Sequence, residues 1–313
     1  MTRLEVIALT VYPVKSMKGI ALQRAELTPL GLAHDRRFMV VREDGQFVTQ
    51  RVLPRLALIH TALEAEELVL SLESHGSARL PLQGNSGDSI RVRVWSDDCE
   101  AVDQGDDIAD WLTSALQSSD GLRLVHMAPG FVRPQSKPAL LGENTHTRFA
   151  DSAPFLIVNQ ASLDALNAEL LTRGHAAVPI NRFRPNVVLT GLAPFAEHGL
   201  VSLAREDYAF RLCYPCQRCI VTTIDQDKAV REQGWQPYKT LADLNPMPGK
   251  NSTPAFGQNA SLLRGGGAQI QVGDHLAATG PGDQPWRLES AGGHPRVSMQ
   301  PPEFFPNPNM NKS

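Results

Sequence analysis

Apolar and polar residues alternate in short runs along the first hundred positions of the chain. A period of two is typical of strands with one face buried, and several runs are rich in β-branched residues. The sequence Asp44-Gly45 follows one run as a hairpin turn would. Strands are therefore predicted at residues 4–14, 22–28, 36–43, 57–63, 67–73 and 89–95. Such a grouping predicts a sandwich or a barrel.

The pattern changes to helical spacing in two places. After Asp106-Asp107, which are expected to cap a helix, apolar residues recur every three or four positions as far as Leu116. A second helix is predicted at residues 162–172, with its leucines on one face. Strands are predicted again at residues 184–190, 207–214, 218–225 and 268–278.

Two polar stretches divide the chain. Residues 128–148 are polar and contain proline, as expected for a long connection. The segment from Gly280 to Ser313 is rich in Pro, Gly, Asn and Ser, which predicts a loosely docked or disordered tail. A chain of 313 residues suits two domains, each of roughly 150 residues. We therefore predict domains at residues 1–125 and 126–279, followed by a tail at 280–313.

Composition excludes several function classes. The net charge is only -3, and no basic run offers the phosphate-neutralising face of a nucleic-acid binder. No stretch approaches the ~20 apolar residues that cross a bilayer, and a secretory signal is not expected at Met1-Thr2-Arg3. The sequence Gly265-Gly266-Gly267 lacks the flanking residues of a nucleotide motif. With four cysteines in a chain of this length, reduced thiols and a cytoplasmic location are predicted.

Three of the four cysteines, Cys213, Cys216 and Cys219, follow one another at intervals of three residues. Thiolates are soft metal ligands, but a structural zinc site or an iron-sulfur cluster would need a fourth ligand from elsewhere. Cys213 could equally be a small buried hydrophobe. Cys219 differs from the others, because Arg218 before it favours a thiolate. The hydroxyls of Thr222 and Thr223 could donate hydrogen bonds around a bound group.

Seven short motifs then occur in a fixed order over residues 1–279, and together they resemble one family. It is the molybdenum cofactor sulfurase C-terminal (MOSC) proteins that carry an N-terminal β-barrel domain, a family that includes the mitochondrial amidoxime-reducing component and bacterial reductases of N-hydroxylated compounds. The motifs are Tyr12-Pro13-Val14-Lys15-Ser16, Asp35-Arg36-Arg37-Phe38, Val48-Thr49-Gln50-Arg51, Asp151-Ser152-Ala153-Pro154-Phe155-Leu156, Phe183-Arg184-Pro185-Asn186, Arg218-Cys219-Ile220-Val221-Thr222-Thr223-Ile224-Asp225 and Phe256-Gly257-Gln258-Asn259.

The resemblance implies a mainly β (α+β) fold, with an N-terminal β-barrel domain packed on a MOSC β-barrel domain that has a few peripheral helices. It also implies a molybdenum-molybdopterin cofactor in the cleft between them, with Cys219 as the catalytic thiolate and metal ligand. Arginines suit such a cofactor, because their planar donors fit phosphate and pterin edges. The expected cofactor-binding residues are Lys15, Ser16, Arg36, Ser152, Arg184, Asn186, Arg218 and Thr222.

The implied activity is reduction of N-hydroxylated compounds from N–OH to N–H. No cysteine follows Cys219, so a plant-type ferredoxin domain is not expected in this chain. Electrons are then expected from a separate donor protein, such as a flavin reductase, a ferredoxin-like protein or a cytochrome. Two alternatives remain at this point: a sulfur or cofactor carrier that uses Cys219 as a persulfide, and a structural metal module built on Cys213, Cys216 and Cys219.

Overall fold

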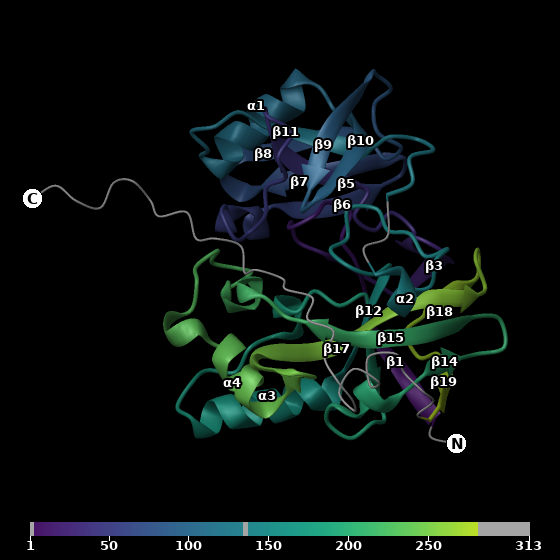
Figure 1. Ribbon diagram of the computed structural model, residues 1–313. Coiled ribbons are helices and arrows are strands. Elements are labelled where there is room, and N and C mark those ends of the chain that lie inside the picture. Colours follow the sequence, from purple (N-terminus) through teal and green to yellow (C-terminus); the bar gives the residue numbers. More distant parts are fainter. Residues whose placement is uncertain (1–2, 134–136, 281–313) are drawn as a thin grey trace, which may run out of the picture.

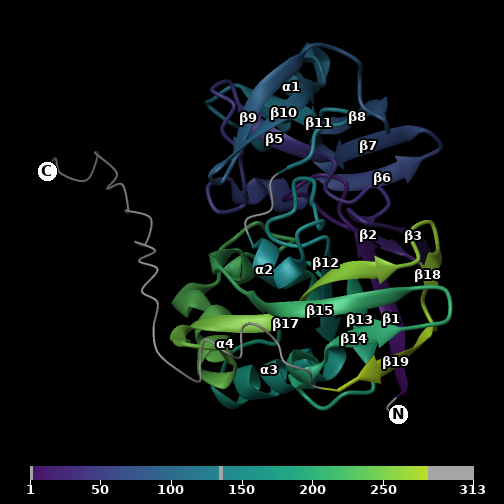
Figure 2. The same cartoon turned by 45° about the vertical axis from the view of Figure 1, so that its right-hand side comes forward.

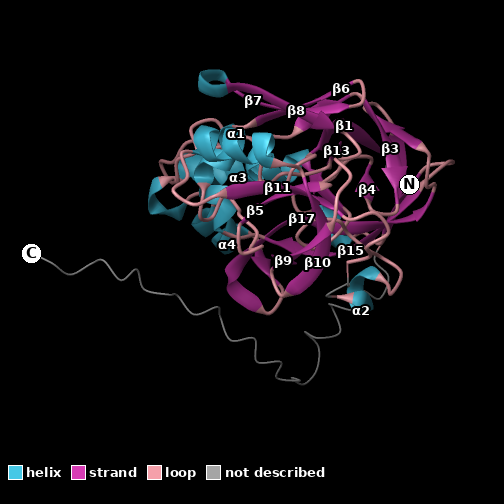
Figure 3. Cartoon of the chain, turned by 90° about the horizontal axis from the view of Figure 1, so that it is seen from above, coloured by secondary structure: helices cyan, strands magenta, loops and turns pink. Residues whose placement is uncertain are grey.

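The computed structural model describes residues 3–133 and 137–280, which form two bodies stacked one above the other (Figure 1). Strands dominate both bodies, and helices lie mostly at the periphery (Figure 3). The mainly β class predicted from the sequence is therefore confirmed. The tail predicted at residues 280–313 lies, beyond Gly280, outside the described residues.

A closed barrel forms the lower body. In the described part of the chain, seven strands pair in a ring that closes where the last returns to the first. All these pairings are antiparallel except that of β12 with β13. In ring order the strands are β12 (Phe155–Asn159), β13 (Val187–Thr190), β1 (Arg3–Val11), β19 (His275–Thr279), β14 (Ser202–Ala204), β15 (Ala209–Gln217) and β17 (Lys250–Arg264).

The start of the chain belongs to this barrel. Strand β1 pairs with both β13 and β19, and β2 (Ile20–Leu22) extends it. Strand β3 (Arg24–Thr28) pairs with β4 (Gly31–Leu32) and with β18 (Gln269–Gln271) (Figure 2). The division of the chain at residue 125 stays a prediction. Residues 3–32 nevertheless contribute strands to the body formed mostly by the second half of the sequence.

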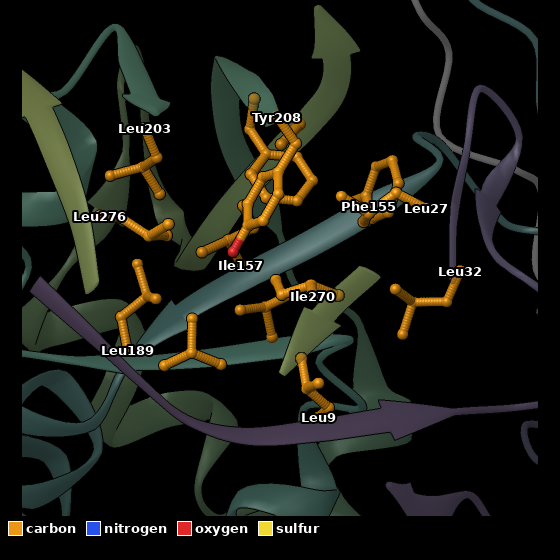
Figure 4. Close-up of a cluster of buried hydrophobic side chains, with 14 of the residues drawn as sticks. Leu9, Leu27, Leu32, Phe155, Ile157, Leu189, Leu203, Tyr208, Ile270 and Leu276 are labelled. Atoms are coloured by element: carbon orange, nitrogen blue, oxygen red, sulfur yellow. The ribbon is translucent and has the colours of Figure 1, made fainter. Parts of the chain in front are cut away.

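Large apolar side chains fill the barrel (Figure 4). The rings of Phe155 and Phe210 meet edge to face with their centroids 5.1 Å apart, and Tyr208 packs on Phe210. The hydroxyl of Tyr208 donates to Asp274, which satisfies its polar end. Each fully buried side chain of this size contributes about 1.5–3 kcal/mol by leaving water. The interior of the barrel is thus a packed hydrophobic core.

The upper body contains two sheets. One has the order β5 (Phe38–Arg42), β11 (Leu122–Met127), β10 (Asp97–Asp103), β9 (Ser89–Val94), and the other has the order β6 (His60–Glu64), β7 (Glu67–Leu72), β8 (Gly76–Pro81). Helix α1 (Asp106–Leu116) packs on β11. Its N-cap is Gly105, so Asp106 and Asp107 lie in the first turn, where carboxylates favour the positive end of the helix dipole. The turn predicted at Asp44-Gly45 is present.

The remaining helices lie in the connections between strands. They are α2 (Pro138–Leu141), α3 (Gln160–Thr172), α4 (Tyr238–Leu244) and the 3-10 turns η1 (Pro54–Leu58), η2 (Glu73–His75), η3 (Ile180–Arg182), η4 (Ala196–Gly199), η5 (Ile220–Thr223) and η6 (Gln233–Trp235), while β16 (Pro246–Met247) pairs with β17. None of the helices in residues 3–133 and 137–280 has the length and apolar character needed to cross a membrane.

A buried arginine fixes the connection between the two halves of the chain. Arg133 is 5% exposed and forms an ion pair with Asp97, in β10. It also donates to the carbonyl oxygens of Arg148 and Ala150 at 3.1 and 2.6 Å. The connection predicted at residues 128–148 is largely irregular in the part the structure describes, and this guanidinium anchors it to the upper body.

Candidate functional site

Two of the arginines expected to bind a cofactor meet where the two bodies join. Arg36 donates to the side chain of Asn186 at 3.1 Å and to the carbonyl oxygen of Arg184 at 3.3 Å. The guanidinium carbons of Arg36 and Arg184 lie 4.3 and 4.2 Å from the centroid of the Tyr12 ring. Contact with one aromatic ring stabilises both cations. The structure therefore brings these motif residues together.

Three expected site residues have left-handed backbones. The φ angles are +71° at Ser16, +44° at Arg36 and +54° at Arg184. Such a conformation costs about 1–3 kcal/mol at a residue other than glycine, and it persists only where the surroundings enforce it. Here the amide of Arg36 donates to the carbonyl of Tyr12, and Nη1 of Arg184 donates to the carbonyl of Met17. Strain of this kind clusters at ligand sites, which supports a functional role.

Lys15 lies beside this pair, but its charge is already compensated. Its ammonium is buried, donates to the carbonyl of Phe149 at 2.7 Å and forms an ion pair with Asp151. Burial lowers the pKa of Lys15, and Asp151 opposes that shift. Although its surroundings disfavour a carboxylate, the pKa of Asp151 lies below its ordinary range, because Lys15 holds the charged form.

Trp95 reaches this ion pair from the turn between β9 and β10. Its indole Nε1 donates to Asp151 at 3.1 Å, and the Arg51 guanidinium lies 4.3 Å from its ring centroid. Trp95 is 41% exposed, and Asp151 exposes 64% of its side chain although protein groups surround it. Neither Trp95 nor Asp151 is among the expected site residues, although Asp151 stands beside Ser152 in a motif.

Asn186 is buried and fully engaged within the protein. Its side-chain oxygen accepts from Arg36 and from the amide of Leu156, while its nitrogen donates to Thr10 and Asp35. Every hydrogen-bonding position of a carboxamide is then occupied. Asn186 therefore positions Arg36, and the cofactor contact expected for it stays a prediction.

The loop that carries Cys219 is a 3-10 turn, so the strand predicted at residues 218–225 is wrong. Cys219 caps η5, and its carbonyl accepts from the hydroxyl of Thr222 at 3.0 Å. The hydroxyl of Thr223 donates to Ile220 in the same way. Threonine side chains that bond nearby carbonyls compete with strand pairing. Thr222 is buried and supports the loop, and the contact with a bound group expected for it stays a prediction.

Arg218 holds this loop against the arginine pair. It donates to the carbonyl of Phe183 at 2.8 Å, next to Arg184, and to the sulfur of Cys216 at 3.0 Å. Arg218 was expected to favour the thiolate of Cys219, whereas its side chain bonds the sulfur of Cys216. Cys219 itself is partly exposed.

The three clustered cysteines do not form a metal centre. Cys213 is buried among apolar residues and contacts Ser261, and Cys216 and Cys219 are partly exposed. In residues 3–133 and 137–280, no group of three or more His, Cys, Asp or Glu side chains is placed to hold a metal. The metal module built on all three thiols is therefore wrong. Ser152, another expected site residue, bonds the hydroxyl of Tyr214 in β15.

The arginines retain free donor capacity. Nη2 of Arg184 and Nε of Arg218 are buried without a hydrogen-bond partner among the described residues. Burial lowers the pKa of Arg184 to about 10, and Arg36 adds to this shift while Tyr12 and Asp35 oppose it. A desolvated cation with a free donor is stabilised by an anionic or polar ligand.

A separate hollow of about 540 Å³ lies on the barrel and contains none of the expected site residues. Its lining comes from β1, β14, β19 and the loop after β14, and includes Arg3, Arg205 and His275. It has no connection with the chemistry described above.

Comparison with known proteins gives two domain matches. The MOSC N-terminal beta barrel domain matches residues 3–119, and the MOSC domain matches residues 144–277. Mitochondrial amidoxime-reducing component 1 of Homo sapiens is 34% identical over 283 residues, which cover 87% of this chain and 82% of that protein. The Mus musculus component 1 is 32% identical with coverage of 87% and 81%. Mitochondrial amidoxime reducing component 2 of Bos taurus is 34% identical with coverage of 85% and 80%.

Proposed function

Since the chain belongs to the family that combines a MOSC N-terminal beta barrel domain with a MOSC domain, we propose that it is a molybdenum-cofactor-dependent oxidoreductase. Its substrates would be N-hydroxylated compounds, reduced from N–OH to N–H with two electrons and two protons and release of water. Relatives named for amidoxime reduction support this reaction. The observation that carries the proposal is the junction where Arg36, Arg184 and the Cys219 loop meet.

The residues at this junction fit a cofactor with a phosphate group and a hydrogen-bonding pterin. Arg184 and Arg218 each have a buried donor without a partner in the described residues, and neither forms an ion pair there. Asp35 is the counterion of Arg36 only. The uncompensated charges of Arg184 and Arg218 therefore leave the junction positive. Lys15, Ser16, Arg36, Arg184 and Arg218 would hold the cofactor. Asn186 would position Arg36, Thr222 would position the Cys219 turn, and Ser152 would offer the cofactor a hydroxyl that also bonds Tyr214.

Molybdenum would supply the redox chemistry, with the Cys219 thiolate as its protein ligand. The protein contributes a thiol that is partly exposed on a rigid turn and cations that are fixed before binding. Fixed donors cost no reorganisation at the moment of reaction. A separate electron-donor protein would complete the cycle. The cytoplasmic location stays a prediction, and the relatives carry mitochondrial names.

Elemental and pterin analysis of the purified protein tests the proposal. Molybdenum and pterin near one equivalent per chain, with turnover of benzamidoxime by reduced viologen, would support it. A metal-free protein carrying cyanide-labile sulfur on Cys219 would instead favour the sulfur carrier. Loaded protein that turns over neither amidoximes nor hydroxylamines would contradict the reductase.

A further inference from the structure

A second pair of arginines lies at the junction with no carboxylate in ion-pairing contact. Arg37 precedes β5 and Arg148 precedes Phe149, and both are partly buried. Burial lowers the pKa of both guanidinium groups, and the charge of Arg37 adds to the shift at Arg148. Among the described residues, neither forms a salt bridge, whereas Arg42 and Arg79 do.

The partners of Arg37 are neutral. Its Nε donates to Nε2 of His126 at 3.2 Å, and its Nη2 donates to the side-chain oxygen of Gln83 at 3.1 Å. A ring nitrogen that accepts is unprotonated, so His126 carries no charge here. Burial and the two arginines lower the pKa of His126 to about 4, which agrees with this state. The histidine orients Arg37 without neutralising it.

Two further donors are unused. Nη1 of Arg148 and Nδ1 of His34 are buried and have no partner in the part of the chain that the structure describes. The amide of Phe149 donates to the carbonyl of Arg36 at 3.1 Å, which places the backbone of Arg148 beside that of Arg37, and His34 lies in the turn just before Arg37. Both arginines lower the pKa of His34. A buried nitrogen without a partner costs folding free energy, and so do two desolvated like charges.

The acidic groups in the neighbourhood do not neutralise this cluster. The charge of Asp35 opposes the lowering of the Arg148 pKa, but its carboxylate accepts hydrogen bonds from Arg36, the amide of Tyr12 and Asn186. Glu26 and Glu66 influence His34 without a hydrogen bond or an ion pair to it in the described residues. The cluster therefore retains a local excess of positive charge.

We propose that Arg37, Arg148 and His34 form a binding site for a dianion of the phosphate class, either free phosphate or a phosphate ester. Two guanidinium groups match the charge of a dianion, and their planar donors suit its oxygens. Nδ1 of His34 can donate a further hydrogen bond in the appropriate tautomer. Its three residues differ from those proposed to hold the cofactor, and the side chains of Arg36 and Arg37 engage different partners.

Calorimetric titration with inorganic phosphate, against chloride at equal ionic strength and pH 7.5, tests this site in the full-length protein. We expect saturable phosphate binding that becomes about ten- to hundredfold weaker in Arg37→Gln and in Arg148→Gln. Arg42→Gln, which alters an exposed ion pair, should bind like the parent. Glycerol 3-phosphate binding at least as tightly as phosphate would identify an ester site, and its rejection would identify a free-anion site.

Thermal unfolding separates this role from packing. In chloride, Arg148→Gln should unfold at the parent temperature or above it, because a like-charge repulsion is removed. In phosphate, the parent should gain stability and the variant should not. Parent-like phosphate affinity in both Gln variants, or a loss of binding confined to Arg184→Gln at the cofactor site, would overturn the proposal.

Discussion

Nη2 of Arg36 donates a hydrogen bond to the backbone carbonyl of Arg184 at 3.3 Å, which joins two residues 148 positions apart in the sequence. Both have left-handed backbones, and both guanidinium groups contact the Tyr12 ring. The two bodies of the molecule therefore share one cationic unit. A ligand that binds this unit contacts both bodies at once.

The first prediction concerns cofactor retention. Arg36→Ala and Arg184→Ala should each weaken binding by roughly 1.5–3 kcal/mol, or about ten- to hundredfold, because a charge-assisted bond is lost. Pterin released from purified protein, measured by fluorescence, should fall while circular dichroism stays unchanged. Arg79→Ala, an exposed arginine with two ion pairs, is the control. Full pterin content in the double variant would make Arg36 and Arg184 ordinary structural residues.

The second prediction separates the thiols. Cys219→Ser replaces a soft ligand by a hard, mostly protonated oxygen and should abolish reductase activity. Cys213→Ser places a hydroxyl in a buried apolar cluster and should mainly lower the free energy of unfolding, by about 0.5–3 kcal/mol. Buried Cys99 in the upper body provides a control for thiol loss away from the site. Parent-like turnover in Cys219→Ser would remove its assignment as the metal ligand.

The third prediction tests the connection between the halves. Arg133→Met keeps the aliphatic stem but leaves Asp97 without its cation, so the free energy of unfolding should fall by about 3–5 kcal/mol. Arg42→Met breaks an exposed pair with Asp120 and should cost at most about 1 kcal/mol. Urea unfolding measures both. Equal losses in the two variants would contradict the anchoring role of Arg133.

The fourth prediction uses a buried carboxyl. Glu197 is 1% exposed, its oxygens accept from Ser162, and burial raises its pKa to about 7. The folded state then binds a proton more tightly than the unfolded state does. The contribution of Glu197 to the free energy of unfolding is fully present below about pH 4.5. It is lost as the pH rises through 7, by about 3 kcal/mol in total. In Glu197→Gln the decline between pH 5 and 8.5 should flatten. A parallel decline in parent and variant, measured by urea unfolding, would exclude Glu197 as its source.

The fifth prediction concerns the electron source. The proposed reaction consumes two electrons per turnover, and we expect the purified protein to be inert with NADH alone. Reduced viologen should support turnover, and NADH should do so once a flavin reductase, ferredoxin-like or cytochrome partner is added. Such partners bind weakly through small interfaces, so the turnover rate should saturate only at high partner concentration. NADH oxidation coupled to hydroxylamine reduction by this chain alone would refute the need for a donor.

Local pattern predicted those elements whose residues obey one period. Helix α1 and strand β9 are examples, since each has one clear apolar face. Strand β17 was missed because it is buried along most of its length and contains Pro254, Gly257 and inward amides such as Gln258. Strand β10 was missed because acidic residues interrupt it. The β-branched run after Cys219 predicted a strand where the structure has a 3-10 turn, because its threonine hydroxyls bond carbonyl groups of the same segment.

The motifs identified most of the residues that meet at the junction, but they did not reveal the roles of those residues. The role of Asn186 depends on its hydrogen bonds, and the bond with Arg36 joins residues 150 positions apart in the sequence. Trp95 was missed because nothing near it in sequence signals Asp151 as its partner. Long-range contacts of this kind have no local pattern.

The pairing of β1 with β19 constrains how the molecule forms. Arg3 lies opposite Ala277, so the ring of strands closes only after roughly 270 further residues have left the ribosome. The sheets of residues 38–127 are made of nearer neighbours and have a lower cost of loop closure. We therefore expect the upper body to fold first during synthesis. Strand β1 would then stay unpaired with β19 until β19 has been synthesised.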